Sequence, residues 1–165
     1  MESRPPEAEP FRLLFVCTGN TCRSPMAEAI ARKRVEDLGW RQVEVGSAGV
    51  GALHGSPAAD GAVRVAAGHG LDLSGHAATY LTAEVAGSAD LILTMSAGHL
   101  ARAEALGHGE RAALITSFAA GADETRGEGI PDPIGGSDDE YAQTFEVLDG
   151  LIERALKRLA PIVDP

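Results

Sequence analysis

A short apolar run ends at a cysteine, and the nine residues that start with it constrain the fold more than any other segment. Leu13 to Val16 are typical of a buried strand, and Cys17 to Pro25 follow as Cys-Thr-Gly-Asn-Thr-Cys-Arg-Ser-Pro. A loop of this length can curl so that its backbone N–H groups converge, and such a nest at a helix N-terminus binds a tetrahedral oxyanion. Arg23 would add a bidentate contact to the same anion. The residues that we expect to bind the phosphate are Thr18, Gly19, Asn20, Thr21, Cys22 and Ser24.

Cys17 has the chemistry of a nucleophile in this loop. The N-terminus of the following helix and the Arg23 cation both favour a thiolate over a thiol. Ser24 suits the cap of that helix and Pro25 its first position. A buried structural cysteine at a strand end is common, but it does not account for the Gly, Asn, Arg and Ser that follow. The segment therefore indicates a phosphate site with a built-in nucleophile.

A metal site is the second alternative for the two cysteines. Zinc normally takes four ligands, and Cys17 and Cys22 are accompanied only by five histidines that are scattered singly along the chain. No pair of histidines has the spacing of metal ligands beside acidic residues. We therefore expect no metal and no cofactor.

Composition is that of a small acidic enzyme. The chain has 165 residues, enough for one well-buried domain, and a formal net charge of −10. This charge argues against binding to nucleic acid or to an anionic membrane. Two cysteines do not make a disulfide framework, and no segment reads as a membrane span or a signal peptide, so we expect a cytoplasmic protein. Residues 1–10 carry three prolines and three glutamates and predict a flexible tail before a single domain at 11–165.

Predicted strands and helices alternate through this domain. The order βαβαβαβα predicts an α/β fold with a parallel sheet between helices, and ligands in such sheets bind at the carboxyl ends of the strands, where Cys17 falls. A capping box at Ser137 to Glu140 opens the final helix, whose predicted apolar stripe is Tyr141, Phe145, Leu148, Ile152, Ala155 and Leu159. The helix that begins near residue 56 is expected to carry Val63 and Ala67 inward. The predicted strands are 13–16, 43–45 (ending at 47–49), 90–95 and 112–115, and the predicted helices begin near residues 24, 56, 96 and 137, with a polar loop at 119–136.

Asp132 is the best candidate for a general acid. Transfer of a phosphoryl group to a thiolate needs a proton donor for the leaving group. No aspartate precedes Cys17, so the acid must come from downstream. Asp132 lies between Pro131 and Pro133 in an otherwise glycine-rich loop, and the two prolines restrict the backbone around its carboxyl group. An ordinary solvated turn would look similar, but the cysteine loop favours the catalytic interpretation.

Together these segments resemble the low-molecular-weight protein-tyrosine-phosphatase family. Its signature, Cys-x-Gly-Asn-x-Cys-Arg-Ser-Pro, is present without a break, and the resemblance extends from the first strand to the last helix. It implies a three-layer domain whose four strands, numbered along the chain, lie in the order 2-1-3-4. The roles that it implies are Cys17 as nucleophile, Arg23 as phosphate clamp, Asp132 as general acid and then base, Ser24 as hydrogen-bond donor to the thiolate, Asn20 as the residue that holds the strained loop, and Ser47 and His76 as supporting contacts.

Two regions depart from the tyrosine-specific branch. Thr21 stands where that branch usually has isoleucine, and Ile134 and Gly135 stand where it has aromatic residues after the Asp-Pro pair. The loop at 50–53 also has no aromatic ring. Both regions resemble the bacterial protein-arginine-phosphatase branch, and phosphoarginine gains less from aromatic walls than phosphotyrosine does. We therefore predict hydrolysis of protein phosphoarginine, with phosphotyrosine as the alternative. The expected partners are phosphorylated proteins, and the expected state is a monomer or weak dimer.

Three other functions fit the sequence less well. An arsenate reductase of this fold needs further cysteines downstream, and none follows Cys22. A phosphocarrier of sugar-transport systems would not need Arg23 or a proton donor such as Asp132. A catalytically silent phosphoprotein-binding module would be expected to have lost Cys17 or Asp132. The presence of all three residues favours a phosphatase.

Overall fold

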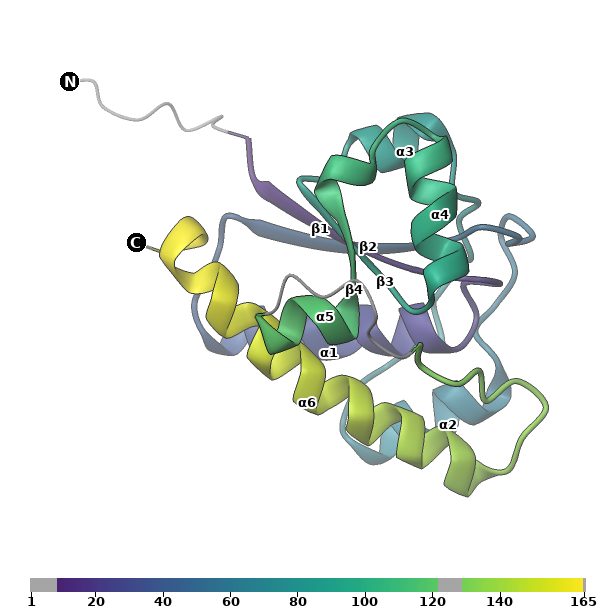
Figure 1. Ribbon diagram of the computed structural model, residues 1–165. Helices are drawn as coiled ribbons and strands as arrows, with labels where there is room; N and C mark the ends of the chain where they lie inside the picture. The colour runs from purple at the N-terminus through teal and green to yellow at the C-terminus, as the bar shows by residue number, and fades with distance from the viewer. Residues whose placement is uncertain (1–8, 122–128, 165) are drawn as a thin grey trace.

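The computed structural model describes residues 9–121 and 129–164, which form alternating strands and helices around one sheet (Figure 1). The elements are β1 Phe11–Cys17, α1 Arg23–Asp37, β2 Val43–Gly49, α2 Asp60–Gly68, α3 Ala83–Gly87, β3 Leu91–Thr94, α4 Ala97–Ala105, the 3₁₀ turn η1 Gly109–Arg111, β4 Ala112–Leu114, α5 Ile115–Ala120 and α6 Asp138–Val163.

All four strands are parallel and lie in the order β2-β1-β3-β4, which confirms the predicted fold class and strand order. β1 lies between β2 and β3, and helices cover both faces of the sheet. Leu13 to Cys17 are therefore all buried. Its register pairs Cys17 with Gly49 and Val16 with Thr94. The carboxyl ends of β1, β2 and β3 therefore meet at one edge of the sheet.

Helices cover both faces of the sheet, so the domain has three layers (Figure 1). On one face, Leu13, Phe15 and Cys17 pack in a core with buried residues of α1, α2, α5 and α6. On the other face, Leu14 and Val16 pack with the smaller helices α3 and α4. The alternation along β1 thus sends successive side chains into two separate cores, as strand geometry requires.

The final helix agrees closely with its prediction. The Ser137 hydroxyl accepts from the Glu140 N–H while the Glu140 carboxylate accepts from the Ser137 N–H, which completes the capping box. Every residue of the predicted apolar stripe is buried, and α6 packs on α1, α2 and α5. The stripe residues are Tyr141, Phe145, Leu148, Ile152, Ala155 and Leu159.

Two helix starts were predicted incorrectly. α1 begins at Arg23 with Cys22 at its cap position, so Ser24 lies inside the first turn and not at the cap. The Ser24 hydroxyl instead turns toward Cys17. α2 begins at Asp60 and not near residue 56, because the preceding Ala59 is extended and its N–H donates to the Thr21 carbonyl at 2.9 Å.

The buried face of α2 also differs from the prediction. Val63 and Ala67 were expected to point inward, but Val63 is partly buried and Ala67 is exposed. Gly61, Ala62 and Ala66 occupy the buried face instead. Ala62 and Ala66 are four residues apart, as Val63 and Ala67 are, so the inward face differs from the expected one by one residue, or about 100° around the helix.

Other differences concern short elements. Ile115 begins α5 and does not extend β4, and α3 was not predicted. A short apolar run cannot by itself separate a strand end from a helix start. Part of the predicted loop at 119–136 and most of the predicted tail at 1–10 lie outside the described residues.

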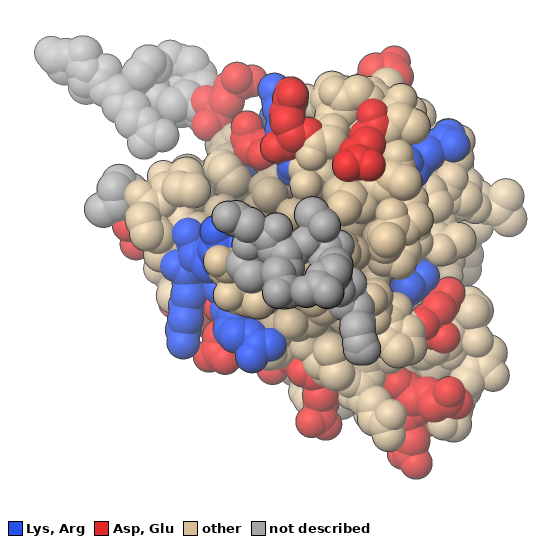
Figure 2. All heavy atoms as spheres, in the orientation of Figure 1, with Lys and Arg blue, Asp and Glu red and all other residues tan. Residues whose placement is uncertain are grey.

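The chain has 24 acidic and 14 basic residues, and acidic side chains gather where α6 begins, at the lower right of Figure 2. The first turn of α6 contributes Asp138, Asp139 and Glu140. Within residues 9–121 and 129–164, no helix is long and apolar enough to cross a membrane.

Candidate active site

The loop between β1 and α1 lies at the carboxyl edge of the sheet and is packed closely against the end of β2. A Cβ atom at Gly49 would lie 2.5 Å from the Thr18 carbonyl oxygen and 2.8 Å from the Asn20 nitrogen. Only glycine allows the backbone of the loop to approach the neighbouring strand this closely. The Val50 N–H then donates to the Cys17 carbonyl at 3.0 Å, so the ends of both strands are tied together.

Cys17 lies at the base of this loop, and its sulfur is 2.9 Å from the Ser24 hydroxyl oxygen. Both residues are buried, with exposed fractions of 2% for Cys17 and 0% for Ser24. The Ser24 oxygen accepts from the Asn20 side-chain amide at 2.7 Å, which leaves the Ser24 hydrogen free to donate to the sulfur. This arrangement suits a thiolate, because a charged acceptor strengthens the hydrogen bond.

Asn20 holds the shape of the loop. Its φ of +55° is the only positive φ at a non-glycine residue in the part of the chain that is described. The Asn20 amide nitrogen also donates to Ser47 Oγ at 2.9 Å, and its amide oxygen accepts from the Thr79 N–H at 2.8 Å. His76 Nε2 lies 2.7 Å from the Asn20 carbonyl oxygen. Four hydrogen bonds therefore surround the strained residue, as a stable left-handed conformation requires.

Behind Asn20 the hydrogen-bonded network continues to the surface. Ser47 Oγ donates to the Glu28 carboxylate at 2.5 Å, and the second oxygen of Glu28 pairs with Arg32 at 2.6 Å. Arg32 also donates to the Val45 carbonyl on the edge strand β2. Ser47 is thus fixed from both sides, which in turn fixes the side chain of Asn20.

Arg23 points into the site from the first residue of α1 and is 5% exposed. Its Nη1 donates to the Ile130 carbonyl at 2.8 Å, and its Nη2 donates to Thr18 Oγ1 at 3.3 Å and to the Asp132 carboxylate at 3.4 Å. The guanidinium plane is therefore fixed by acceptors from two segments that are more than 100 residues apart in the sequence.

Asp132 faces this guanidinium from the loop that precedes α6. Its side chain is 39% exposed, so the carboxylate is accessible from solvent. Its second oxygen accepts from the Ile134 N–H at 3.1 Å, which orients the carboxyl group between the two flanking prolines. The loop is anchored to the sheet because the Ile130 N–H donates to the Met95 carbonyl at 2.7 Å, just past the end of β3.

Cys22, the last residue of the loop, packs in the same core as Cys17 but has a hydrogen-bond partner of its own. Its sulfur lies 3.4 Å from the Tyr141 hydroxyl of α6, and both side chains are buried. Burial raises the pKa of the Cys22 thiol, and burial followed by the contact with Cys22 raises the pKa of the Tyr141 hydroxyl. At neutral pH Cys22 is therefore a thiol.

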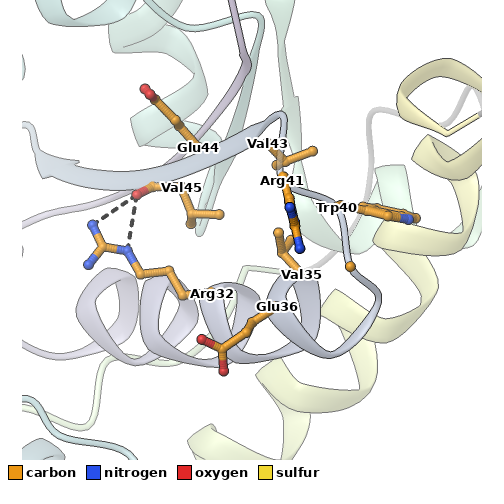
Figure 3. A pocket seen from close by; sticks show the side chains of 9 residues that line it. Arg32, Val35, Glu36, Trp40, Arg41, Val43, Glu44 and Val45 are labelled. Carbon is orange, nitrogen blue, oxygen red and sulfur yellow. Dashed lines mark hydrogen bonds between the residues drawn. The ribbon is translucent and has the colours of Figure 1, made fainter.

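A hollow of about 670 Å³ lies elsewhere, between α1 and the amino half of β2 (Figure 3). It is lined by Arg32, Val35, Glu36, Gly39, Trp40, Arg41, Val43, Glu44 and Val45. None of these residues is a cysteine, serine, threonine or histidine. Since Cys17 pairs with Gly49 at the opposite end of β2, this hollow is separate from the phosphate-binding loop.

All of the residues predicted for the site lie together in the structure. Arg23 and Asp132 are in direct contact, and Ser47 and His76 both contact Asn20. Their catalytic roles stay predictions. Sequence reasoning gave no role in the site to Thr79, His99, Ile130 and Tyr141, which contact the loop or Arg23, or to Glu28, which contacts Ser47. Among the described side chains, no group of three or more His, Cys, Asp or Glu is arranged to hold a metal ion.

Comparison with known proteins agrees with this site. The family model described as low molecular weight phosphotyrosine protein phosphatase matches residues 12–163. The low molecular weight protein-tyrosine-phosphatase Etp of Escherichia coli is 39% identical over 148 residues, which cover 90% of this chain and 94% of Etp. The protein-arginine-phosphatase of Bacillus subtilis is 36% identical over 149 residues, 89% of this chain and 95% of that protein.

A solved structure shows the same architecture. The YwlE arginine phosphatase, in a variant with a phosphorylated active-site serine, superposes with a TM-score of 0.83 at 36% identity and covers 90% of this chain and 95% of that one. The fold, the unbroken loop signature and the match over 12–163 lead to one conclusion. The chain belongs to the low molecular weight phosphotyrosine protein phosphatase family, whose members are hydrolases.

Proposed function

We propose that the chain hydrolyses phosphorylated protein side chains through a phosphocysteine intermediate on Cys17, and that phosphoarginine is the preferred substrate. The contact that carries the catalytic part is the 2.9 Å approach of the Ser24 hydroxyl to the Cys17 sulfur beneath a loop closed by Arg23. A thiolate stabilised in this way is a nucleophile placed directly below an oxyanion site.

The reaction has two steps. In the first, the Cys17 thiolate attacks phosphorus, an S–P bond forms, and the bond from phosphorus to the leaving nitrogen or oxygen breaks. Asp132 donates its proton to that leaving atom and becomes a carboxylate. In the second, a water molecule loses a proton to Asp132 and attacks the phosphocysteine, which releases inorganic phosphate and restores the thiolate. Arg23 and the loop N–H groups balance the charge on the phosphoryl oxygens in both steps.

The residues at the rim of the site support phosphoarginine as the preferred substrate. Thr21 lies in the phosphate-binding loop and is partly buried, and its hydroxyl oxygen is 3.8 Å from the Cys22 sulfur. We expect this hydroxyl to be within reach of the substrate atoms that follow the phosphoryl group. The flanking segments 50–53 and 133–136 have no aromatic side chain, and they present the exposed aliphatic residues Leu53 and Ile134. A flat phosphotyrosine ring would find little aromatic surface there, whereas a guanidinium group gains a hydroxyl as a hydrogen-bond partner.

Phosphotyrosine is the second candidate because relatives of both kinds are similar to this chain. Etp, named as a tyrosine phosphatase, and the protein-arginine-phosphatase of Bacillus subtilis differ by only three percentage points in identity to it. Overall similarity therefore favours neither substrate, and the choice rests on the residues that line the site.

A direct comparison of two peptides tests both parts of the proposal. Phosphoarginine and phosphotyrosine peptides of the same flanking sequence are assayed with the wild-type protein and with Cys17→Ser. We expect kcat/KM to be higher for phosphoarginine, and we expect Cys17→Ser to abolish turnover of both peptides while phosphate binding persists. A preference for phosphotyrosine would reject the substrate assignment alone. Turnover by Cys17→Ser at the wild-type rate would reject the mechanism.

A further inference from the structure

A buried histidine outside the predicted site touches the phosphate-binding loop. His99 lies in the first turn of α4, the helix that follows β3, and its side chain is 4% exposed. Its Nε2 atom is 2.9 Å from the Thr18 hydroxyl oxygen, although the two residues are 81 positions apart in the sequence. Because β1 and β3 are neighbours whose carboxyl ends meet at one edge, α4 begins beside the loop (Figure 1).

Thr18 joins this histidine to Arg23. The Thr18 hydroxyl oxygen accepts from Arg23 Nη2 at 3.3 Å while it contacts His99. The other acceptors of Arg23 are the Ile130 carbonyl and the Asp132 carboxylate. Thr18 is exposed, so burial does not hold its rotamer. The buried ring of His99 supplies that restraint through a hydrogen bond.

His99 is neutral in this position. Burial, followed by the nearby positive charge of Arg23, lowers the pKa of the imidazole to about 4, and Asp132 opposes this only in part. A neutral ring has one N–H group and one bare nitrogen. Nδ1 is buried and has no hydrogen-bond partner among the described residues. An unpaired buried acceptor is more common than an unpaired buried N–H group, so the proton is placed on Nε2.

We propose that His99 is a positioning residue for this reaction: its Nε2–H group donates to Thr18 Oγ1 and so fixes the hydroxyl that receives Arg23. His99 does not touch the substrate. The inference rests on the proposed function, because the orientation of Arg23 matters for catalysis only if an oxyanion binds in the loop. A consequence is that removing His99 weakens the hold on phosphate without removing the nucleophile or the general acid.

Removal of the ring nitrogen gives the first test. His99→Leu keeps much of the side-chain volume, and His99→Gln keeps a donor at the end of a side chain of similar length. We expect His99→Leu to raise both KM and the inhibition constant of inorganic phosphate by about 3- to 10-fold, the effect of one hydrogen bond. We expect His99→Gln to restore part of the loss. His108, which follows the other end of α4, provides the matched control in His108→Leu and His108→Gln.

Dependence on Thr18 gives the second test. If His99 acts through this hydroxyl, His99→Leu should raise the phosphate inhibition constant in the wild-type background and leave it unchanged in a Thr18→Val background. Equal effects in both backgrounds would show that His99 only fills space beside the loop, and would overturn the proposal.

The wild-type protein gives the third test, which needs no folded variant. The ¹⁵N chemical shifts of the two imidazole nitrogens should show a proton on Nε2 at neutral pH, and titration with inorganic phosphate should shift the His99 signals more than those of His108. A proton on Nδ1, or His99 signals that phosphate leaves unmoved, would overturn the proposal. The variant Arg23→Lys distinguishes failure of the His99 inference from failure of the proposed function. If Arg23→Lys leaves phosphate affinity unchanged, the proposed function fails as well.

Discussion

The Ser24 hydroxyl lies 2.9 Å from the Cys17 sulfur and is held there by the Asn20 amide, which donates to the same oxygen at 2.7 Å. The serine oxygen has accepted a hydrogen bond, so its own hydrogen is directed at the sulfur. The position inside the first turn of α1 makes this possible, because a cap residue would direct its side chain to the helix backbone instead. The residue expected to cap the helix thus contacts Cys17, the proposed nucleophile.

Ser24→Ala should reduce the reactivity of Cys17. A hydrogen bond to a charged group is worth about 1.5–3 kcal/mol, so we expect kcat/KM to fall by about 10- to 100-fold. Inactivation by iodoacetate at neutral pH should slow in parallel, because the variant lacks the hydrogen bond to the Cys17 sulfur. Ser88→Ala, at an exposed serine that ends α3, is the control. Unchanged alkylation in Ser24→Ala would show that the serine is not needed for the thiolate.

Asp132→Asn should lower the rate by about 10²–10⁴, the usual contribution of a general acid. The amide oxygen of asparagine can still accept from the Ile134 N–H, so the loop should keep its shape. The loss should be smallest for substrates whose leaving groups need no protonation. The check is a series of aryl phosphates with different leaving groups, with Asp139→Asn as the control at an exposed position in α6. A loss that is equal across the series would mean that Asp132 only orients Arg23.

Gly49→Ala should damage the loop although it changes no predicted catalytic group. The new methyl group would lie 2.5 Å from the Thr18 carbonyl oxygen and 2.8 Å from the Asn20 nitrogen. Both are backbone atoms that cannot rotate away. We expect a loss of about 1–3 kcal/mol in unfolding free energy together with a fall in kcat/KM. Gly46→Ala on the same strand is the control, because its nearest neighbour is a leucine methyl group at 3.7 Å. Equal stability and activity in the two variants would contradict the close approach.

Much of the fold could be predicted from sequence because its signals are local. The strand at 13–16, the cysteine loop and the capping box at Ser137 each occupy a few consecutive residues. His99 and Thr79 contact the loop across 81 and 59 positions, and Thr79 does so through its backbone N–H, which any residue other than proline could supply. His99 comes close to Thr18 only because β3, which precedes its helix, pairs with β1. The predicted start of α2 was wrong for a similar reason. The Ala59 N–H donates a hydrogen bond to the carbonyl of the distant Thr21, and the helix begins only after it.

Cys22 should form a disulfide with oxidised Cys17, and the rate of disulfide formation should depend on pH. Peroxide converts the Cys17 thiolate to a sulfenic acid. Attack by the Cys22 thiolate on that sulfur forms the S–S bond and expels hydroxide, which takes a proton from solvent and becomes water. Burial raises the pKa of Cys22, so the fraction of thiolate is small at neutral pH and grows as pH rises through and beyond the ordinary range of a thiol.

Mass spectrometry checks this prediction. After brief oxidation, the disulfide between Cys17 and Cys22 should form faster at alkaline than at neutral pH, and dithiothreitol should restore activity. Cys22→Ser lacks the second thiol and should be inactivated irreversibly by prolonged peroxide. If dithiothreitol restored Cys22→Ser as fully as the wild-type protein, Cys22 would have only a packing role against Tyr141.

Thr21→Ile should move the preference toward phosphotyrosine. Thr21 is part of the phosphate-binding loop, so its side chain can meet the first atoms of the substrate beyond the phosphoryl group. Isoleucine offers a wider apolar surface that suits a ring and crowds a branched guanidinium, and it removes the hydroxyl available to a leaving nitrogen. One such change is worth about 1–3 kcal/mol, or about 10- to 200-fold in the ratio of specificity constants.

The measurement is kcat/KM of the variant for matched phosphoarginine and phosphotyrosine peptides, with Thr21→Val as the control that removes the hydroxyl at nearly constant volume. If the ratio does not move in Thr21→Ile, the rim of the site and not the loop residue sets the substrate.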